Sequence, residues 1–161
     1  MTLLDFVDSD MRFHVRVAAV CICDGHVLLQ GWDDAGRWIL PGGRGEMLET
    51  TPDSIRREMS EEFLIDVEVG RLLWVSERFW TTEDVRTHQI GFIYEVHLPE
   101  ACDLRDVTRD FAGDDGGTPF IARWFPIESL PDVWVQPSFL CQALQSLPET
   151  PQHIVQTDSR S

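Results

Sequence analysis

The sequence from Gly42 to Ile65 reads GGRGEMLETTPDSIRREMSEEFLI and joins a glycine-rich loop to a predicted helix. Thr51 suits the N-cap, and Pro52 suits the first helical position, where the N–H that proline lacks would have no intrahelical partner. Asp53 then lies near the positive end of the helix dipole. No helix-breaking residue follows before about Phe63. The segment therefore predicts a helix that begins at Pro52.

The predicted helix carries an apolar stripe beside a row of carboxylates. At about 100° per residue, Ile55, Met59 and Phe63 share one arc of the helix surface. The adjoining arc holds Glu58, Glu61 and Glu62. These carboxylates are three or four positions apart, so their charges repel and destabilise the helix. One interpretation is a solvated helix face. The other is a divalent cation that offsets the repulsion, and oxygen ligands of this kind suit Mg²⁺ or Mn²⁺.

The spacing around these residues resembles the signature of the Nudix hydrolases. Glu49 follows Gly43 after five residues, and Arg57 opens the run REMSEE after seven more. Ile65 fills the last apolar position of the signature. Two positions depart from it, because Leu64 and Leu48 stand where members of the family commonly have glycine. A left-handed backbone at either leucine would be strained relative to glycine.

The resemblance implies an α+β fold, namely a Nudix-type α/β/α sandwich with a mixed β-sheet between helices. It also implies hydrolysis of a phosphoanhydride bond by an enzyme that uses Mg²⁺, with Mn²⁺ as a substitute. We expect the bond to lie in a nucleoside diphosphate linked to another moiety, such as ADP-ribose or a nucleotide sugar. One alternative is a pyrophosphohydrolase that converts (d)NTP to NMP and pyrophosphate. A non-catalytic nucleotide-binding or sensor module is another, although the intact carboxylates argue against it.

The resemblance also assigns roles within the signature. The catalytic set is Glu49, Arg57, Glu58, Glu61 and Glu62, and the metal ligands are Glu58, Glu61, Glu62 and a backbone carbonyl of Gly42 or Gly43. Glu58 and Glu62 are the expected direct ligands, and Glu61 is a ligand or a base that orients water. Arg57 and Glu49 are expected to form a structural ion pair. For a further general base, Asp114 and Asp115 are the best candidates between Glu100 and Trp124.

Aromatic and polar residues outside the signature are candidates for substrate binding, because an aromatic ring can stack on a nucleobase for about 1–3 kcal/mol. The aromatic candidates are Trp32, Trp38, Phe79 and Trp80; the polar ones are Arg78, His88 and Gln89. Each aromatic residue also fits a core position. Because Phe79 and Trp80 are adjacent in a predicted strand, one of them should face away from the core.

Length and charge set the wider expectations. A chain of 161 residues fits one domain, which we place at residues 12–147, after a loosely held arm (1–11) and before a disordered tail (148–161). A net charge of −15 argues against nonspecific nucleic-acid binding. No apolar run is long enough for a membrane span and the N-terminus lacks a secretory pattern, so we expect a cytoplasmic protein. The expected partner is a small nucleotide, and a homodimer stays open.

Alternation and turn residues predict the other elements. Asp24-Gly25 is typical of a two-residue hairpin turn. The predicted strands are Phe13–Cys23, His26–Trp32, Val67–Val75, Arg86–Leu98 and Phe120–Phe125. Pro99–Thr118 is expected to be an exposed loop, and Ser138–Leu147 to be a packing helix. Cys21 and Cys23 fit buried free thiols better than a zinc site.

Overall fold

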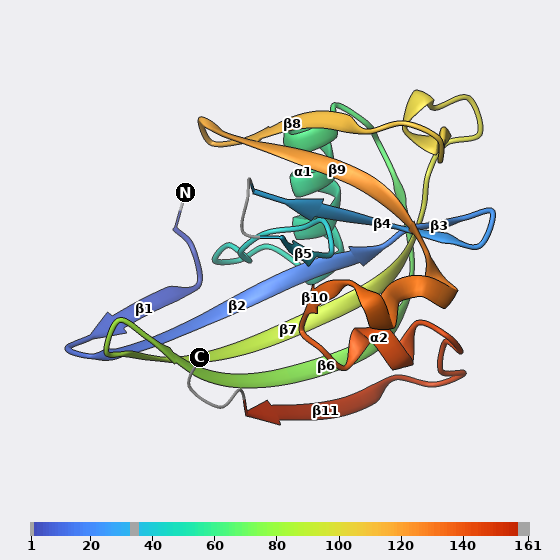
Figure 1. Cartoon of the computed structure of the whole chain (residues 1–161). Coiled ribbons are helices and arrows are strands. Elements are labelled where there is room, and N and C mark those ends of the chain that lie inside the picture. The colour runs from blue at the N-terminus through green and yellow to red at the C-terminus, as the bar shows by residue number, and fades with distance from the viewer. Residues whose placement is uncertain (1, 33–35, 158–161) are drawn as a thin grey trace.

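The computed structural model describes residues 2–32 and 36–157, and its elements form two β-sheets, one long helix and several short helical turns (Figure 1). The α-helices are α1 (Thr51–Phe63) and α2 (Leu140–Ala143), and the 3-10 turns are η2 (Asp103–Arg105) and η3 (Ile127–Asp132). The strands are β1 (Asp5–Asp8), β2 (Met11–Val20), β3 (Ile22–Cys23), β4 (His26–Gly31), β5 (Arg37–Ile39), β6 (Glu68–Thr82), β7 (Val85–His97), β8 (Phe111–Asp115), β9 (Thr118–Pro126), β10 (Trp134–Gln136) and β11 (Gln152–Thr157).

The first sheet has the order β1-β2-β7-β6-β11 and mixes parallel and antiparallel pairs. Side chains along β2 alternate between its two faces. Val17 and Ala19 pack with Ile55 of α1, whereas Ala18 and Val20 belong to the core that contains Leu140 of α2. Helical segments therefore cover both faces, and the predicted α+β sandwich with mixed pairing is confirmed.

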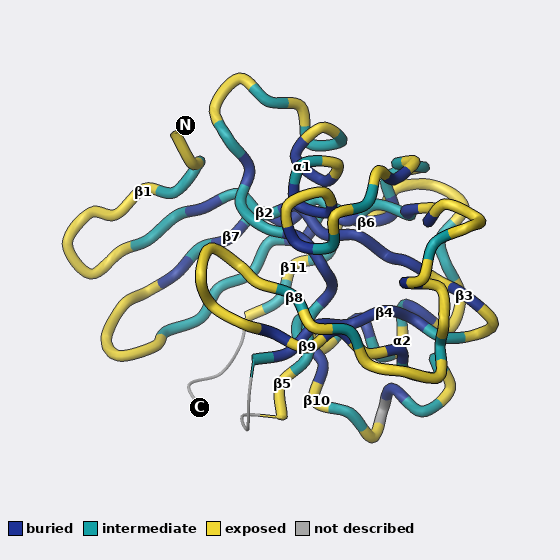
Figure 2. The backbone as a smooth tube through the Cα atoms, turned by 90° about the horizontal axis from the view of Figure 1, so that it is seen from above, coloured by how far each residue is buried: buried dark blue, intermediate teal, exposed yellow. Residues whose placement is uncertain are grey.

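The second sheet has the order β10-β5-β4-β9-β8, and β3 also pairs with β4. The chain enters it through the predicted Asp24-Gly25 hairpin, whose φ angles of 47° and 73° are both left-handed, as a type I′ turn requires. Figure 2 shows the buried stretches of β2 and β4 in the interior, with exposed turns at the ends of the long hairpins. This sheet brings β5 and β10 over the first sheet, as Figure 1 shows.

The helix start differs by one residue from the prediction. The N-cap of α1 is Thr50, whose hydroxyl accepts a hydrogen bond from the backbone N–H of Asp53, with an N–O distance of 3.3 Å. Thr51 was the expected cap, but its hydroxyl is 2.8 Å from the hydroxyl of Tyr94 on β7. Both threonines suit the cap, but Thr51 contacts Tyr94, so Thr50 takes the cap position.

Both chain ends are more ordered than the sequence predicts. Within the expected arm, β1 pairs with β2, and Asp5 forms a salt bridge with Arg12. Within the expected tail, β11 pairs with β6 in parallel, and Ile154 packs against the buried core. One apolar side chain among polar ones is a weak sequence signal for such a strand. Residues 158–161, and residues 33–35 of the expected loop after Trp32, lie outside the described part of the chain.

Two further elements differ from expectation. The expected loop Pro99–Thr118 contains η2 and β8, because Phe111 packs against the core and Gly116-Gly117 supplies a tight turn to β9. The expected helix Ser138–Leu147 shortens to α2, because hydrogen bonds on either side of it span three residues instead of four. In the part of the chain that the structure describes, no helix is long and apolar enough to cross a membrane.

Candidate active site

The helix α1 carries two buried carboxylates beside its apolar stripe. Ile55 and Met59 are fully buried against the first sheet. Glu58 and Glu62 lie one turn apart at the edge of that stripe and are only 8% and 7% exposed. Glu61, the third predicted ligand, has a mostly exposed side chain. The helix therefore presents two acidic side chains to the interior and one to solvent.

The predicted ion pair between Arg57 and Glu49 is present and belongs to a larger network. The Nε of Arg57 donates to Oε1 of Glu49 at 3.0 Å, and its Nη1 donates to Oε1 of Glu58 at 2.8 Å. Nη1 also reaches Oε2 of Glu61 at 3.4 Å. The hydroxyl of Ser54 donates to Glu49 at 2.6 Å. Arg57 thus fixes the orientation of Glu58 and ties the start of α1 to the loop before it.

Gly42 and Gly43 let the backbone of the loop lie closer to neighbouring groups than a residue with a Cβ would allow. Gly42 has a φ of 136°, and a Cβ there would lie 2.2 Å from the carbonyl oxygen of Val17. A Cβ on Gly43 would lie 2.2 Å from the carboxyl carbon of Glu58. The carbonyl of Gly43 accepts from the N–H of Val17 at 2.9 Å, and that of Gly42 accepts from Arg16 at 3.0 Å. Both predicted carbonyl ligands already accept one hydrogen bond, and each keeps a second lone pair.

Burial strongly disfavours the charged forms of the two inner carboxylates. It raises the pKa of Glu62 to about 8, and the nearby charge of Glu58 adds to this rise. Burial also raises the pKa of Glu58, although the hydrogen bond from Arg57 opposes it. Oε1 of Glu62 accepts a long hydrogen bond from Gln30 at 3.5 Å, whereas Oε2 has no partner among the described residues. A buried carboxylate oxygen without a partner is costly, so the site favours a cation.

Arg16 belongs to the site, although the sequence analysis treated its strand only as a buried one. Its Nη2 donates to the carbonyls of Leu40 at 3.3 Å and Gly42 at 3.0 Å. Burial lowers its pKa, and the charges of Glu62 and Glu58 act against that shift. The guanidinium therefore faces the carboxylates without forming a direct ion pair to them. A single arginine between Val15 and Val17 is the sequence signal that identifies it.

The β8–β9 hairpin separates the two candidate bases. Oδ1 of Asp114 accepts from the N–H of Gly117 at 2.6 Å, so this side chain holds the turn. Asp115, the next residue, lies close enough for its charge to contribute to the raised pKa of Glu62 and to act on Arg16. Phe120 crosses Gly113, where a Cβ would lie 2.0 Å from the ring. Gly113 thus lets the hairpin pack closely beside the carboxylates.

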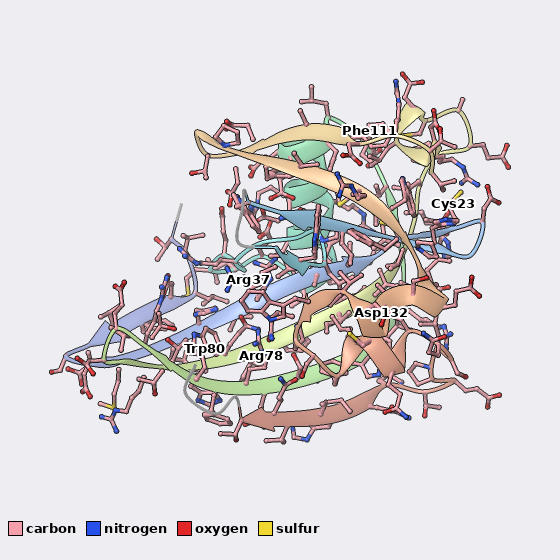
Figure 3. All side chains as sticks on the ribbon, viewed as in Figure 1. Cys23, Arg37, Arg78, Trp80, Phe111 and Asp132 are labelled. Carbon is pink, nitrogen blue, oxygen red and sulfur yellow. The ribbon has the colours of Figure 1, made fainter. Side chains whose placement is uncertain are left out.

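Arg16 lines a cavity of about 880 Å³, whereas Glu58 and Glu62 are not among the residues that line it. Ser76, Arg78 and Trp80 of β6 line the floor, and Gln89 and Gly91 of β7 lie beside them. Alternate residues of β5 and β10 form the opposite wall: Arg37 and Ile39 from the first, Trp134 and Gln136 from the second. Figure 3 shows Arg37 on the β5 side and Arg78 with Trp80 on the β6 side.

Three of the proposed substrate-binding residues therefore line the cavity, namely Arg78, Trp80 and Gln89. Phe79 and His88 do not, since adjacent residues of a strand point to opposite faces. Their rings stack on each other with centroids 4.3 Å apart. Trp32 packs against Phe120, and Trp38 packs against Phe125. The rings of these four residues pack against other side chains and do not line the cavity.

The fold and the paired carboxylates define a class of hydrolase, and comparison with known proteins gives the same class. A model of the NUDIX domain matches residues 12–143, so the chain belongs to the Nudix family. Membership confirms the predicted enzyme class, a hydrolase acting on pyrophosphate bonds. No curated protein matches the sequence at a significant level.

Solved structures share the fold at low sequence identity. A NUDIX hydrolase from Nitrosomonas europaea superposes with a TM-score of 0.61 at 19% identity, covering 90% of this chain and 79% of the other. A UDP-X diphosphatase gives 0.59 at 19% identity, covering 88% and 66%. An ADP-ribose pyrophosphatase from Streptococcus suis gives 0.51 at 16% identity, covering 88% and 98%. Identities this low establish the fold alone.

Proposed function

We propose that this protein hydrolyses, with Mg²⁺ or Mn²⁺, a phosphoanhydride bond in a nucleoside diphosphate linked to a second moiety. The observation that carries the proposal is the pair of buried glutamates, Glu58 and Glu62, whose charges act on Arg16, a residue that lines a cavity of about 880 Å³. Known ligand pockets span about 300–1,000 Å³, so this cavity has room for more than a nucleobase. Two structural relatives are described as acting on molecules of this kind.

The residues present fit a divalent cation. Glu62 has a carboxylate oxygen without a hydrogen-bond partner among the described residues, and the absent side chain of Gly43 lets the carboxylate of Glu58 pack against the backbone of the loop. Glu58 and Glu62 would hold the ion, with a loop carbonyl as a further oxygen ligand. Glu61, the third predicted ligand, points to solvent, and among the described residues no three His, Cys, Asp or Glu side chains gather at one point. Oxygen-only ligands favour Mg²⁺ or Mn²⁺ over softer metals. When bound, such an ion would neutralise phosphate charge and make a water molecule more acidic.

The chain's own residues complete the chemistry. Arg16 lines the cavity, and the charges of Glu58 and Glu62 act on its guanidinium. It would bind a phosphate oxygen and stabilise the negative charge that develops on the leaving phosphate. Asp115 would accept the proton of the attacking water, because it is the aspartate of the hairpin whose charge reaches Glu62. Arg57 holds Glu58 in place and contacts no part of the cavity.

A hydrolysis screen tests the proposal. Purified protein would be incubated with ADP-ribose, nucleotide sugars, and (d)NTPs, each with Mg²⁺ and with Mn²⁺, and the products would be separated by ion-exchange chromatography. We expect a nucleoside monophosphate and a phosphorylated second moiety from the linked substrates. Release of pyrophosphate from (d)NTPs alone would instead support the alternative activity. Absence of turnover on every class would contradict the proposal and favour a binding module.

A further inference from the structure

The charged residues that line the cavity are mainly positive, whereas the chain as a whole is negative. The chain has a net charge of −15. Among the described residues that line the cavity, three are arginines and one is acidic: Arg16, Arg37, Arg78 and Glu83. Like charges kept together in a partly enclosed space point to an anionic ligand.

Two amide side chains, Gln136 and Gln89, line the cavity together with the arginines and keep a donor group. Nη2 of Arg78 donates to Oε1 of Gln136 at 2.7 Å, so the NH₂ of Gln136 remains as a donor. Oε1 of Gln89 lies 3.0 Å from Nε2 of His14, so its NH₂ also remains. Oxygen-rich groups such as phosphate and carboxylate use such donors best.

Arg37 and Arg16 belong to different parts of the cavity wall. Arg16 binds the carbonyl of Leu40, at the end of the cavity near Glu58 and Glu62. Arg37 lies three residues before Leu40 along the extended β5 segment, which is about 10 Å. It forms no ion pair with any residue in the described ranges, whereas most other arginines pair with a carboxylate, as Arg71 does with Glu95. The backbone of Arg37 therefore lies apart from the segment that Arg16 binds, which leaves Arg37 available for a second anion.

We propose that Arg37 and Arg78 form a second anion subsite, which selects nucleoside diphosphate derivatives carrying an additional phosphate or carboxylate on the moiety in the cavity. Arg78 is held for this role by Gln136 and by the ring of Trp80, whose centroid lies 5.0 Å from the guanidinium carbon. The subsite rests on the proposed function for its substrate class. It adds a preference that the carboxylates of α1 do not supply.

Matched substrate pairs test this preference. NADPH differs from NADH by one phosphate, and UDP-glucuronate differs from UDP-glucose by one carboxylate, so the two pairs separate the two sources of charge. We expect the kcat/KM of at least one charged member to exceed that of its neutral partner by about tenfold or more. Arg37→Gln and Arg78→Gln should bring that ratio close to one, and Arg37→Lys should keep part of it. Arg71→Gln, on the same strand but outside the cavity, should leave the ratio unchanged.

Binding measured without turnover separates this inference from the proposed function. Isothermal titration calorimetry of the full chain with each of the four molecules, in EDTA, should show the same preference and its loss in Arg37→Gln. A preference without hydrolysis would support the subsite and contradict the proposed function. Equal affinity within both pairs, or no detectable binding of any of the four, would overturn the subsite even if hydrolysis occurs. A preference that survives both Gln substitutions would also overturn it.

Discussion

Leu64 ends α1 in a conformation that leucine rarely adopts. Its φ of 57° and ψ of 34° are left-handed, and its side chain is 89% exposed. Leu48, at the other departure from the Nudix signature, has a φ of 66° and is also fully exposed. The structure therefore supports the strained-cap interpretation of Leu64, since the side chain gains no burial in return.

Leu64→Gly should change the free energy of unfolding by between zero and a gain of about 1 kcal/mol. Relief of left-handed strain is worth roughly 1–2 kcal/mol, and the greater freedom of glycine in the unfolded chain removes part of it. Leu64→Ala keeps a Cβ in the left-handed conformation and should bring no such gain. Urea titrations of the three proteins measure the difference. Destabilisation of Leu64→Gly by 1 kcal/mol or more would reject the strained cap.

Glu62 should make the metal-free protein less stable as the pH rises. Its pKa is raised to about 8 in the folded state, chiefly by burial, against about 4.3 in an unfolded chain. The folded state then holds this proton more tightly, so its contribution is fully present below about pH 4 and is lost as the pH approaches 8. We expect melting temperatures in EDTA to fall between pH 6 and pH 9, and Glu62→Gln to fall less steeply. Parallel curves for the two proteins would contradict this assignment.

At the scale of elements, the β8–β9 hairpin assigns different tasks to two adjacent aspartates. Asp115→Asn should lower kcat by about 10²-fold or more with little change in stability, because it would remove the proposed base, whose charge acts on Glu62. Asp114→Asn is the matched control, since Asp114 bonds the backbone of Gly117 in the turn. It should affect stability by no more than about 1 kcal/mol and leave kcat near normal. Equal loss of kcat in both variants would show that the hairpin, not Asp115, matters.

The strand β11 should contribute measurably to stability, although the sequence analysis placed it in a disordered tail. Ile154 packs against the core, whereas Val155 points outward and is 60% exposed. Ile154→Ala should lower the free energy of unfolding by about 1–2 kcal/mol, less than a fully buried isoleucine would. Val155→Ala should have little effect. Denaturant titration compares them, and equal, negligible effects would mean that β11 is not held to β6 in solution.

At the scale of the molecule, local signals predicted more than long-range ones did. Spacing from Gly43 to Ile65 was enough to place the glutamates, and the Asp24-Gly25 turn followed from turn chemistry. The strands β1 and β8 were missed because they are short segments with few apolar residues, although each pairs with the next strand in the sequence. The strand β11 was missed because its partner, β6, lies far away in the sequence. Arg16 was missed as a site residue for the same reason, since its role depends on Leu40 and Gly42 in another segment.

The cavity shows the same limit. Alternation predicted that Phe79 and Trp80 face opposite ways, but only the pairing of β6 with β7 and the cover of β5 and β10 show which one lines the cavity. Nothing local distinguishes Arg37 from the other surface arginines. Its place follows from the parallel pairing of β5 with β10, which sets Arg37 opposite Trp134.

The central claim is that Glu58 and Glu62 bind a divalent cation that the reaction requires. The most direct measurement is the melting temperature with and without millimolar Mg²⁺, because an ion that binds only the folded state stabilises it by mass action. We expect Mg²⁺ to raise the melting temperature of the native protein, and Glu58→Gln/Glu62→Gln to abolish both this rise and hydrolysis. A rise that persists in the double variant, or hydrolysis that proceeds without a metal, would contradict the account.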